Sequence, residues 1–278
     1  MIDTHAHLNF SSFKDDLDEV MQEIMRLKMR VINVGSQFST SQRAVELADK
    51  YPANLFAAIG LHPIHLFEME FDELEMPFKT RREEFHAENY EKLSQHKNVV
   101  AIGEIGIDYF KQPSNVTIKE FKDKQKWTFL KQLQLAKKLN LPYILHCRGS
   151  KEAFEDAYKD ALAVIRDFKY FHGVVHCFAA NWEIARKFLD LGLLISFTGI
   201  ITFPKTEFLG QVVKKIPLDR VMAETDAPFL APQLVRGKRN EPRYVRYIID
   251  KIADLKRITY EEAEEATTKN AESFFNLH

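Results

Sequence analysis

Two histidines near the start of the chain, His5 and His7, are separated by one residue and follow a short apolar run. On an extended strand, residues i and i+2 point to the same face, so both imidazoles can be directed toward one point. Neutral imidazole is the commonest metal ligand among protein side chains. The pair therefore indicates part of a metal site whose other ligands come from elsewhere in the chain.

Further histidines and carboxylates stand where short β-rich runs end, namely His62, Glu104, His146, His176 and Asp226. In a barrel of parallel strands these ends meet at one rim, so the side chains would converge with His5 and His7. A single histidine at a strand end is more often a hydrogen-bonded wall residue than a ligand. The joint occurrence of these residues favours a two-metal centre with a bridging carboxylate.

The elements that would position these residues are short strands alternating with amphipathic helices. The predicted strands are Ile2–Thr4, Val31–Val34, Leu55–Ile59, Val99–Ile102, Tyr143–Leu145, Gly173–Val175, Leu193–Phe197 and Arg220–Ala223. The predicted helices are Asp15–Lys28, Ser41–Lys50, Glu83–His96, Ile118–Asn140, Lys151–Phe168, Trp182–Leu191, Glu207–Lys215, Pro242–Leu255 and Tyr260–Phe275. This alternation predicts an α/β fold, a (β/α)8 TIM barrel, with an open doubly wound sheet as the alternative.

Composition limits the class of protein. With 278 residues, of which 45% are hydrophobic and 28% charged, and with no linker rich in Gly, Ser or Pro, one domain spanning residues 1–278 is the simplest expectation. The 40 acidic and 39 basic residues nearly cancel, so a nucleic acid would have to bind a local patch. Two cysteines are too few for a disulfide framework, and no leader or long apolar span is evident. We expect a cytoplasmic protein without membrane association or an obligate protein partner.

Seven motifs, in order along the chain, resemble those of the TatD family of metal-dependent deoxyribonucleases within the amidohydrolase superfamily. They are Asp3-Thr-His5-Ala-His7, Gly60-Leu-His62-Pro63, Gly103-Glu104-Ile-Gly106-Ile-Asp108-Tyr109, His146-Cys-Arg148, His176-Cys-Phe178, Glu224-Thr225-Asp226-Ala-Pro228-Phe229-Leu230 and Arg239-Asn240-Glu241-Pro242. The resemblance covers essentially the whole chain and implies a TIM barrel of the metallo-dependent hydrolase type. Two departures are Ala179-Ala180 after the sixth strand and a long acidic insertion at residues 65–82.

The resemblance also implies a ligand set and an activity. The implied metal ligands are His5, His7, Glu104, His146, His176 and Asp226, with Glu104 bridging two divalent ions. His and carboxylate ligands suit Zn, Mn, Co and, less well, Mg. Family members hydrolyse DNA, several as 3′ to 5′ exonucleases. We therefore expect a hydrolase that uses two divalent ions (Mg, Mn or Zn) and acts on DNA with single-stranded or frayed ends.

Catalytic roles follow from residue chemistry. Glu104 suits the bridge because one carboxylate offers two oxygens, and Asp226 can orient or deprotonate the nucleophilic water. His62 can contact the scissile phosphate or act as a general acid. Asp108 is expected to orient a neighbouring ligand rather than bind metal, as carboxylates behind metal-bound imidazoles commonly do.

Substrate contacts are predicted from basic and aromatic residues near the strand ends. Arg148 would share a face with His146 and hold a phosphate oxygen through its planar fork, with a surface ion pair as the alternative. Arg239 and Asn240 close a basic run that begins at Arg236 and could bind substrate phosphates, although such runs are usually solvated loops. Candidates for stacking on a terminal base are Tyr109, Phe110, Phe178 and Phe203, at least two of which are expected in the core.

Cys147 and Cys177 each adjoin a proposed ligand but would point the other way on a strand, so both are interpreted as small buried apolar residues. Two further functions are compatible with the same barrel. One is hydrolysis of a small amide or phosphoester by the same centre. The other is a non-catalytic metal-binding barrel, against which the complete ligand set argues.

Overall fold

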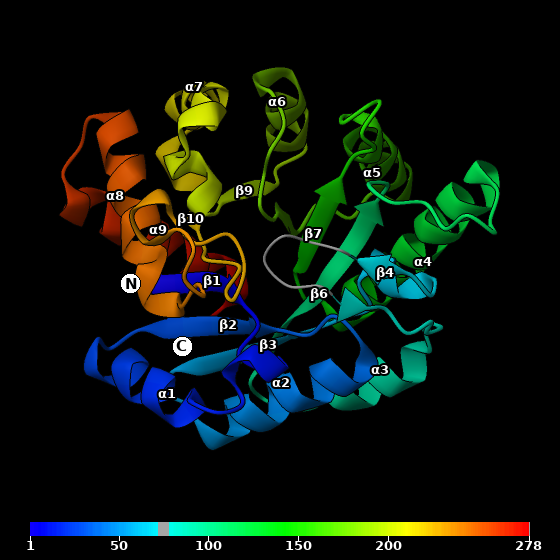
Figure 1. Cartoon of the computed structure of the whole chain (residues 1–278), viewed down its shortest axis with the longest axis horizontal. Coiled ribbons are helices and arrows are strands. Elements are labelled where there is room, and N and C mark those ends of the chain that lie inside the picture. Colours follow the sequence, from blue (N-terminus) through cyan, green and yellow to red (C-terminus); the bar gives the residue numbers. More distant parts are fainter. Residues whose placement is uncertain (72–77, 278) are drawn as a thin grey trace.

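Eight parallel strands form a barrel in this computed structural model, which describes residues 1–71 and 78–277 (Figure 1). The strands, in their order around the sheet, are β1 Ile2–Ala6, β2 Arg30–Val34, β3 Leu55–Ile59, β6 Val99–Asp108, β7 Tyr143–Arg148, β8 Gly173–Val175, β9 Leu194–Phe197 and β10 Val221–Ala223. Each pairs in parallel with the next in this order. The predicted TIM barrel is confirmed.

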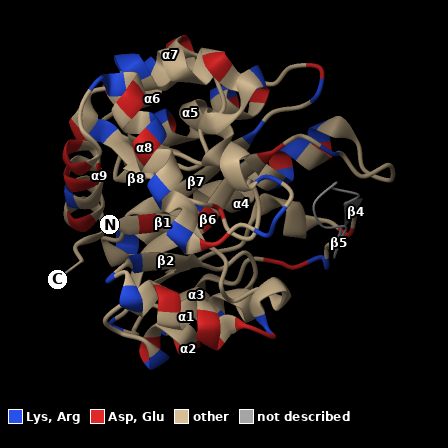
Figure 2. Ribbon diagram, turned by 60° about the vertical axis from the view of Figure 1, so that its left-hand side comes forward, with Lys and Arg blue, Asp and Glu red and all other residues tan. Residues whose placement is uncertain are grey.

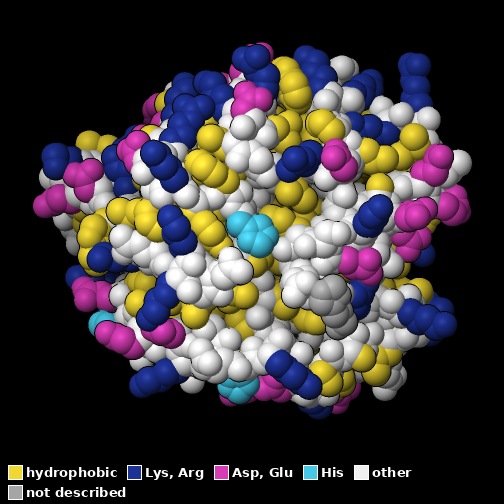
Figure 3. All heavy atoms as spheres, turned by 180° about the vertical axis from the view of Figure 1, so that it is seen from behind, with side chains coloured by type: hydrophobic (Ala, Val, Ile, Leu, Met, Phe, Trp, Pro, Cys, Tyr) yellow, Lys and Arg dark blue, Asp and Glu magenta, His cyan; other side chains and the backbone are white. Residues whose placement is uncertain are grey.

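Helices follow the strands and form the outer layer of Figure 1. They are α1 Leu17–Arg26, α2 Phe38–Lys50, α3 Ala87–Leu93, α4 Ile118–Leu139, α5 Asp156–Phe168, α6 Trp182–Asp190, α7 Glu207–Lys215, α8 Val245–Lys256 and α9 Tyr260–Phe275. In α1, the residues at helical spacing Val20, Met21 and Ile24 are buried, as an apolar stripe requires. The ribbon of Figure 2 marks acidic and basic residues on the same helices, and Figure 3 shows side chains of both charges interspersed with apolar side chains on the rear face.

The barrel closes where β1 meets the segment that follows β10. Ala6 forms a parallel bridge with Ala227. The His7 amide donates to the Ala227 carbonyl at 2.7 Å, and the Asp226 amide donates to the His5 carbonyl at 2.8 Å. Closure therefore brings the histidine pair next to Asp226, and an open sheet is excluded.

Strand β6 is longer than predicted, because it continues beyond Ile102 to Asp108. Its register against β7 shifts between Ile102 and Ile105. Gly106 has a φ of +142°, and a Cβ there would lie 2.1 Å from the His146 carbonyl oxygen, so only glycine lets the two strands approach this closely. Glu104 thus lies within the irregular part of a strand rather than after its end.

The predicted acidic insertion, residues 65–82, starts within a short 3-10 turn, Pro63–Leu66, and includes a two-stranded hairpin of β4 Glu70–Phe71 and β5 Phe78–Lys79. Residues 72–77 of the predicted insertion lie outside the described residues. The hairpin extends from the loop between β3 and α3 (Figure 1).

The core has two parts. The larger lies between barrel and helices, and the smaller combines strand residues such as Ile32 and Ile144 with Phe274, Phe275 and Leu277 at the end of α9. Burial of these large apolar groups is the main favourable contribution to folding. None of the helices in the described part of the chain is long and apolar enough to cross a membrane.

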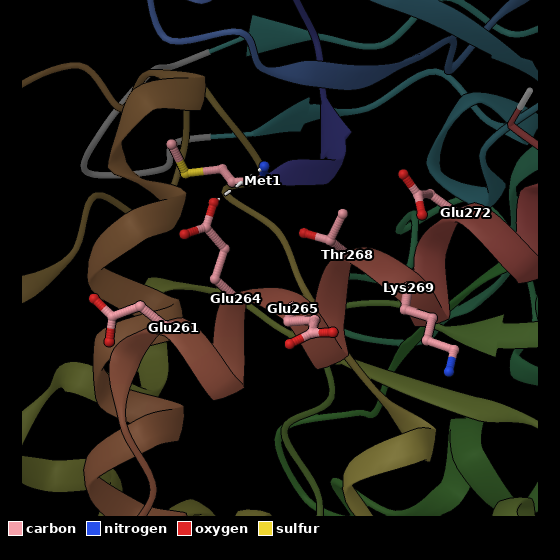
Figure 4. Close-up of a pocket in the computed structure, with 7 residues that line it drawn as sticks. All are labelled: Met1, Glu261, Glu264, Glu265, Thr268, Lys269 and Glu272. Carbon is pink, nitrogen blue, oxygen red and sulfur yellow. Dashed lines mark ion pairs between the residues drawn. The ribbon is translucent and has the colours of Figure 1, made fainter.

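A surface hollow of about 400 Å³ lies along α9 (Figure 4). Its lining includes Glu261, Glu265 and Glu272, and the Met1 amino group pairs with Glu264 at 3.2 Å. Met1 precedes the N-terminal end of β1, whereas His5 and His7 lie at the other end of this strand. The hollow is therefore separate from the predicted catalytic rim.

A capping box starts α9, since the Thr259 hydroxyl accepts from the Glu262 amide and the Glu262 carboxylate accepts from the Thr259 amide. We predict that Thr259→Ala lowers the free energy of unfolding by about 1 kcal/mol, because an N-terminal amide loses its partner. Urea denaturation checks this value. Thr259→Ser keeps the hydroxyl and serves as the control; equal losses in both variants would contradict the role of the cap.

Candidate metal centre

The carboxylate of Glu104 lies at the middle of the histidines on the rim. The shortest distances from its oxygens to ring nitrogens are 3.4 Å for His5 Nε2, 3.8 Å for His7 Nε2, 3.4 Å for His62 Nε2, 2.7 Å for His146 Nδ1 and 3.5 Å for His176 Nε2. Five imidazoles from four strands or their loops thus surround one carboxylate. The barrel therefore brings these residues together at one rim, as predicted.

Glu104 is nearly inaccessible to solvent, with 6% of its side chain exposed. Burial alone raises the pKa of a carboxyl group because it disfavours the charged form. Here the nearby His62, His176 and His5 outweigh burial and hold the pKa of Glu104 well below its usual range. Glu104 is therefore a carboxylate at neutral pH, as a metal ligand must be.

Asp226 is the second carboxylate of the centre. Its Oδ1 lies 3.7 Å from His5 Nε2, 3.5 Å from His7 Nε2 and 4.0 Å from His176 Nε2. Burial raises its pKa, but His7, His176 and His5 together lower the pKa below its ordinary value. Because 14% of its side chain is exposed, Asp226 provides a charged oxygen on the solvent side of the cluster.

Among the described residues, four triads at the rim have ligand atoms close enough to hold a cation, and two of these triads share Glu104. One comprises His5, His7 and Glu104, and the other His62, Glu104 and His146. Within each triad the ligand atoms all lie within 4.8 Å of one another. Imidazole and carboxylate donors suit Zn, Mn or Co, so the residues present fit a divalent metal.

Hydrogen bonds at the far ring nitrogens distinguish His7 from His62. His7 Nδ1 lies 2.8 Å from the Val34 carbonyl, which only accepts, so its Nε2 directs a lone pair toward the centre. His62 Nδ1 instead accepts from the Ile64 amide at 3.2 Å, so in the neutral ring the proton resides on Nε2. His7 is thus arranged as a ligand and His62 as a hydrogen-bond donor.

Carboxylates behind two ligands hold them in the protonated state in the metal-free protein. Asp108 Oδ2 lies 3.0 Å from His146 Nε2, and Glu224 Oε1 lies 2.7 Å from His176 Nδ1. Burial lowers the pKa of both rings, but these carboxylates and Glu104 raise it to about 9 for His146 and about 10 for His176. The expected orienting role of Asp108 agrees with this contact.

Glu224 and Asp3 are supporting residues to which sequence reasoning assigned no role. Glu224 also accepts from the Cys177 amide at 2.7 Å. Asp3 accepts from the Thr225 hydroxyl at 2.5 Å and the Thr225 amide at 2.8 Å, and burial raises its pKa to about 8. Their only signal in the sequence was their position two residues before a ligand, at Asp226 and His5.

Two residues at the rim have left-handed backbone conformations, Cys177 with a φ of 44° and Asp226 with a φ of 60°. Such conformations are uncommon outside glycine and concentrate at functional sites. The prediction that Cys177 points away from the ligands is wrong, because β8 ends at Val175 and the alternation of a strand no longer applies. Its sulfur joins a triad with His176 and Asp226, whereas Cys147 is buried as predicted.

Arg148 is opposite Asp108 in the register between β6 and β7. Its guanidinium stacks on the Phe110 ring, 3.7 Å from the ring centroid, and is partly exposed. On another side of the rim, Phe10 stacks on the His7 ring at 4.4 Å, with Phe229 at 6.3 Å from each. The mouth is thus bordered by aromatic rings.

The predicted substrate residues Arg239 and Asn240 have structural partners instead. Arg239 forms a double hydrogen bond with Asp16 and a further one with the Ser12 carbonyl. Asn240 is fully buried and donates to the carbonyls of Thr225 and Phe229. Because an inaccessible amide has no group to offer a phosphate, we replace the predicted substrate contact of Asn240 with support of the loop that carries Asp226.

The described site agrees with the similarities of the chain to known proteins. A family model described as TatD related DNase matches residues 2–276. The uncharacterized metal-dependent hydrolase YabD of Bacillus subtilis is 38% identical over 281 residues, and the alignment covers 100% of both chains. The similarly described YcfH of Escherichia coli K12 is 32% identical over 283 residues, covering 100% of this chain and 96% of YcfH.

Similarity in three dimensions extends over the same length. The crystal structure of YJJV, a TatD homolog from Escherichia coli K12, superposes with a TM-score of 0.84 at 27% identity. The alignment covers 100% of this chain and 98% of that one. The barrel and its loops thus match a solved protein from end to end.

Metal binding should release protons, because His146 and His176 are protonated in the metal-free protein at pH 7.5 and a ligand must be neutral. We predict a release approaching two protons per chain and an affinity for Mn²⁺ that rises with pH up to about pH 10. Calorimetric titration in two buffers of different ionisation enthalpy measures the number. Glu224→Gln should reduce it by about one, since His176 loses the charge that holds its proton; a pH-independent affinity would contradict the assignment.

Proposed function

The chain belongs to the TatD-related DNase family of metal-dependent hydrolases, and we propose that it cleaves phosphodiester bonds of DNA as a 3′ to 5′ exodeoxyribonuclease with two divalent ions. The observation that supports the two-metal proposal is the position of the Glu104 carboxylate within 3.8 Å of His5 and His7 on one side and within 3.5 Å of His146 and His176 on the other. His5, His7 and Asp226 would hold one ion, and His146 and His176 the other, with Glu104 between them. When bound, the ions supply Lewis acidity that acidifies water and stabilises charge on phosphate oxygens.

Asp226 is the residue we assign to the nucleophilic water. It is ionised at neutral pH, as the lowered pKa indicates, and it combines contact with three histidines and partial exposure to solvent. A carboxylate in this position accepts a hydrogen bond from water, orients it and can receive its proton. Glu104, which is less exposed and lies within 3.8 Å of five imidazoles, stays a ligand.

His62 would donate a hydrogen bond to the scissile phosphate. The Ile64 amide occupies Nδ1, which leaves the Nε2 proton to point at the centre. Burial lowers the pKa of this ring, so the neutral donor form prevails at physiological pH. Of the two roles predicted for His62, contact with phosphate is therefore better supported than general acid catalysis.

Arg148 would hold a second phosphate oxygen. The Phe110 ring fixes the plane of the guanidinium, and planar guanidinium groups bind phosphate through paired N–H donors. Arg148 lies two residues beyond His146 on β7, which supports a role for it beside the proposed ions. Together, His62 and Arg148 would orient the phosphodiester for attack.

The first test is the degradation of a 5′-labelled single-stranded DNA by protein that has been treated with chelator and then supplied with Mg²⁺, Mn²⁺ or Zn²⁺. We predict a ladder that shortens from the 3′ end in wild type and no cleavage in Glu104→Ala, because both triads lose their shared carboxylate. Glu264→Ala, which removes a carboxylate beside Met1 on α9, is the matched control. An active, metal-replete Glu104→Ala protein would refute the shared-ligand mechanism.

Arg148→Ala should lower kcat/KM for DNA by roughly 10-fold to 100-fold, the usual worth of a charged hydrogen-bond donor. Arg148→Lys keeps the charge without the planar fork and should give an intermediate value. Steady-state kinetics on an oligonucleotide of fixed length measures both. Unchanged kinetics in Arg148→Ala would assign the residue to structure alone.

A further inference from the structure

The rim carries a second stack of a guanidinium on a phenyl ring, formed by loops on another side of the barrel. Arg236, in the loop after β10, lies 4.4 Å from the ring centroid of Phe203, in the loop after β9. Building on the proposed function, we propose that Arg236 and Phe203 form a nucleotide-binding subsite for single-stranded polynucleotide, additional to the scissile phosphate contacts. The Arg236 guanidinium would bind a phosphate, and a base would stack on the exposed face of the Arg236–Phe203 pair.

No carboxylate in the described ranges, residues 1–71 and 78–277, pairs with the guanidinium of Arg236. Its side chain is exposed and, within residues 1–71 and 78–277, forms no hydrogen bond or ion pair. Arg239, three residues later, donates to Asp16 through both terminal nitrogens. A guanidinium stacked on a ring keeps its N–H edge available for phosphate, while the ring restricts its orientation. The cation available to substrate in this basic run is thus Arg236 rather than Arg239.

Apolar surface lies beside this cation. Leu234, two residues before Arg236, is 74% exposed, and Phe203 is partly exposed. Exposed Lys205 and Lys238 follow Phe203 and Arg236 by two residues each and add positive charge to both loops. Neighbouring cations and apolar faces match the alternating phosphates and bases of a single strand, whose bases stack on aromatic and guanidinium planes.

The two loops are held together, so the stack is preformed. The Gln233 amide donates to the Thr202 hydroxyl at 2.8 Å, which joins the residues immediately beside Leu234 and Phe203. Gly199 packs so closely on the other loop that a Cβ would lie 2.3 Å from the Leu230 carbonyl oxygen. The Phe203 amide and carbonyl are both hydrogen-bonded within their own loop. Preformed contacts reduce the entropy lost on binding.

The test is the affinity of the metal-loaded protein for a 5′-labelled dT12 with phosphorothioate linkages, which resist hydrolysis, measured by fluorescence anisotropy. We expect Arg236→Ala and Phe203→Ala each to weaken binding about fivefold or more, as loss of a phosphate contact or a stacking plane does. The slope of log affinity against log salt should fall by about 0.7 in Arg236→Ala. Arg186→Ala removes an exposed arginine of α6, paired with Glu183, and should bind like wild type.

An abasic dT12 analogue tests the base contact and the phosphate contact separately. Its affinity should no longer be changed by Phe203→Ala but should still be weakened by Arg236→Ala. Equal affinities for wild type, Arg236→Ala and Phe203→Ala would overturn the proposal, as would an equal loss in Arg186→Ala. The assay does not require turnover. If wild type cleaves no DNA yet binding depends on Arg236 and Phe203, the proposed nuclease activity is refuted and the subsite is supported. If wild type cleaves DNA and both variants bind as tightly as wild type, the nuclease activity is supported and the subsite is refuted.

Discussion

The arrangement of polar residues at the C-terminal ends of the barrel strands depends on one constraint, the buried negative charge of Glu104. An ionised carboxylate removed from water is costly unless charges or donors surround it. Five imidazoles surround Glu104. Two of them, His146 and His176, are in the positively charged imidazolium form because Asp108 and Glu224 contact their outer ring nitrogens. Glu104 is thus surrounded by imidazoles, and two of these imidazoles are backed by further carboxylates. Divalent ions, when bound, would take the place of the protons on His146 and His176.

The rest of the fold serves this arrangement by separating polar and apolar ends of the barrel. At the end where strands begin, the smaller core packs Ile2, Ile32 and Ile144 against Phe274 and Phe275 of α9. At the other end, the bridge between Ala6 and Ala227 joins the first and last parts of the barrel and places the histidine pair beside Asp226. Asp3 and Asn240 hold this junction through Thr225, so closure of the barrel and assembly of the centre depend on the same contacts.

Sequence analysis predicted the alternation of strands and helices, because burial patterns and turns are local properties of the chain. It also predicted the converging polar residues, since parallel strands present their ends at one rim. It missed the extension of β6 through Glu104, which depends on the close approach of Gly106 to the His146 carbonyl. The partners of Arg239, Asn240 and Glu224 were equally inaccessible, because residue type and spacing do not reveal which distant group a side chain meets.

The most direct test of a shared Glu104 is electron paramagnetic resonance of the protein loaded with Mn²⁺, together with metal analysis. Two ions bridged by one carboxylate interact magnetically, so the account predicts two Mn²⁺ per chain and the spectrum of a coupled pair. Glu104→Gln should lose the coupling. A single ion per chain, or two ions with the six-line spectrum of isolated Mn²⁺, would contradict the bridging role on which the proposed mechanism rests.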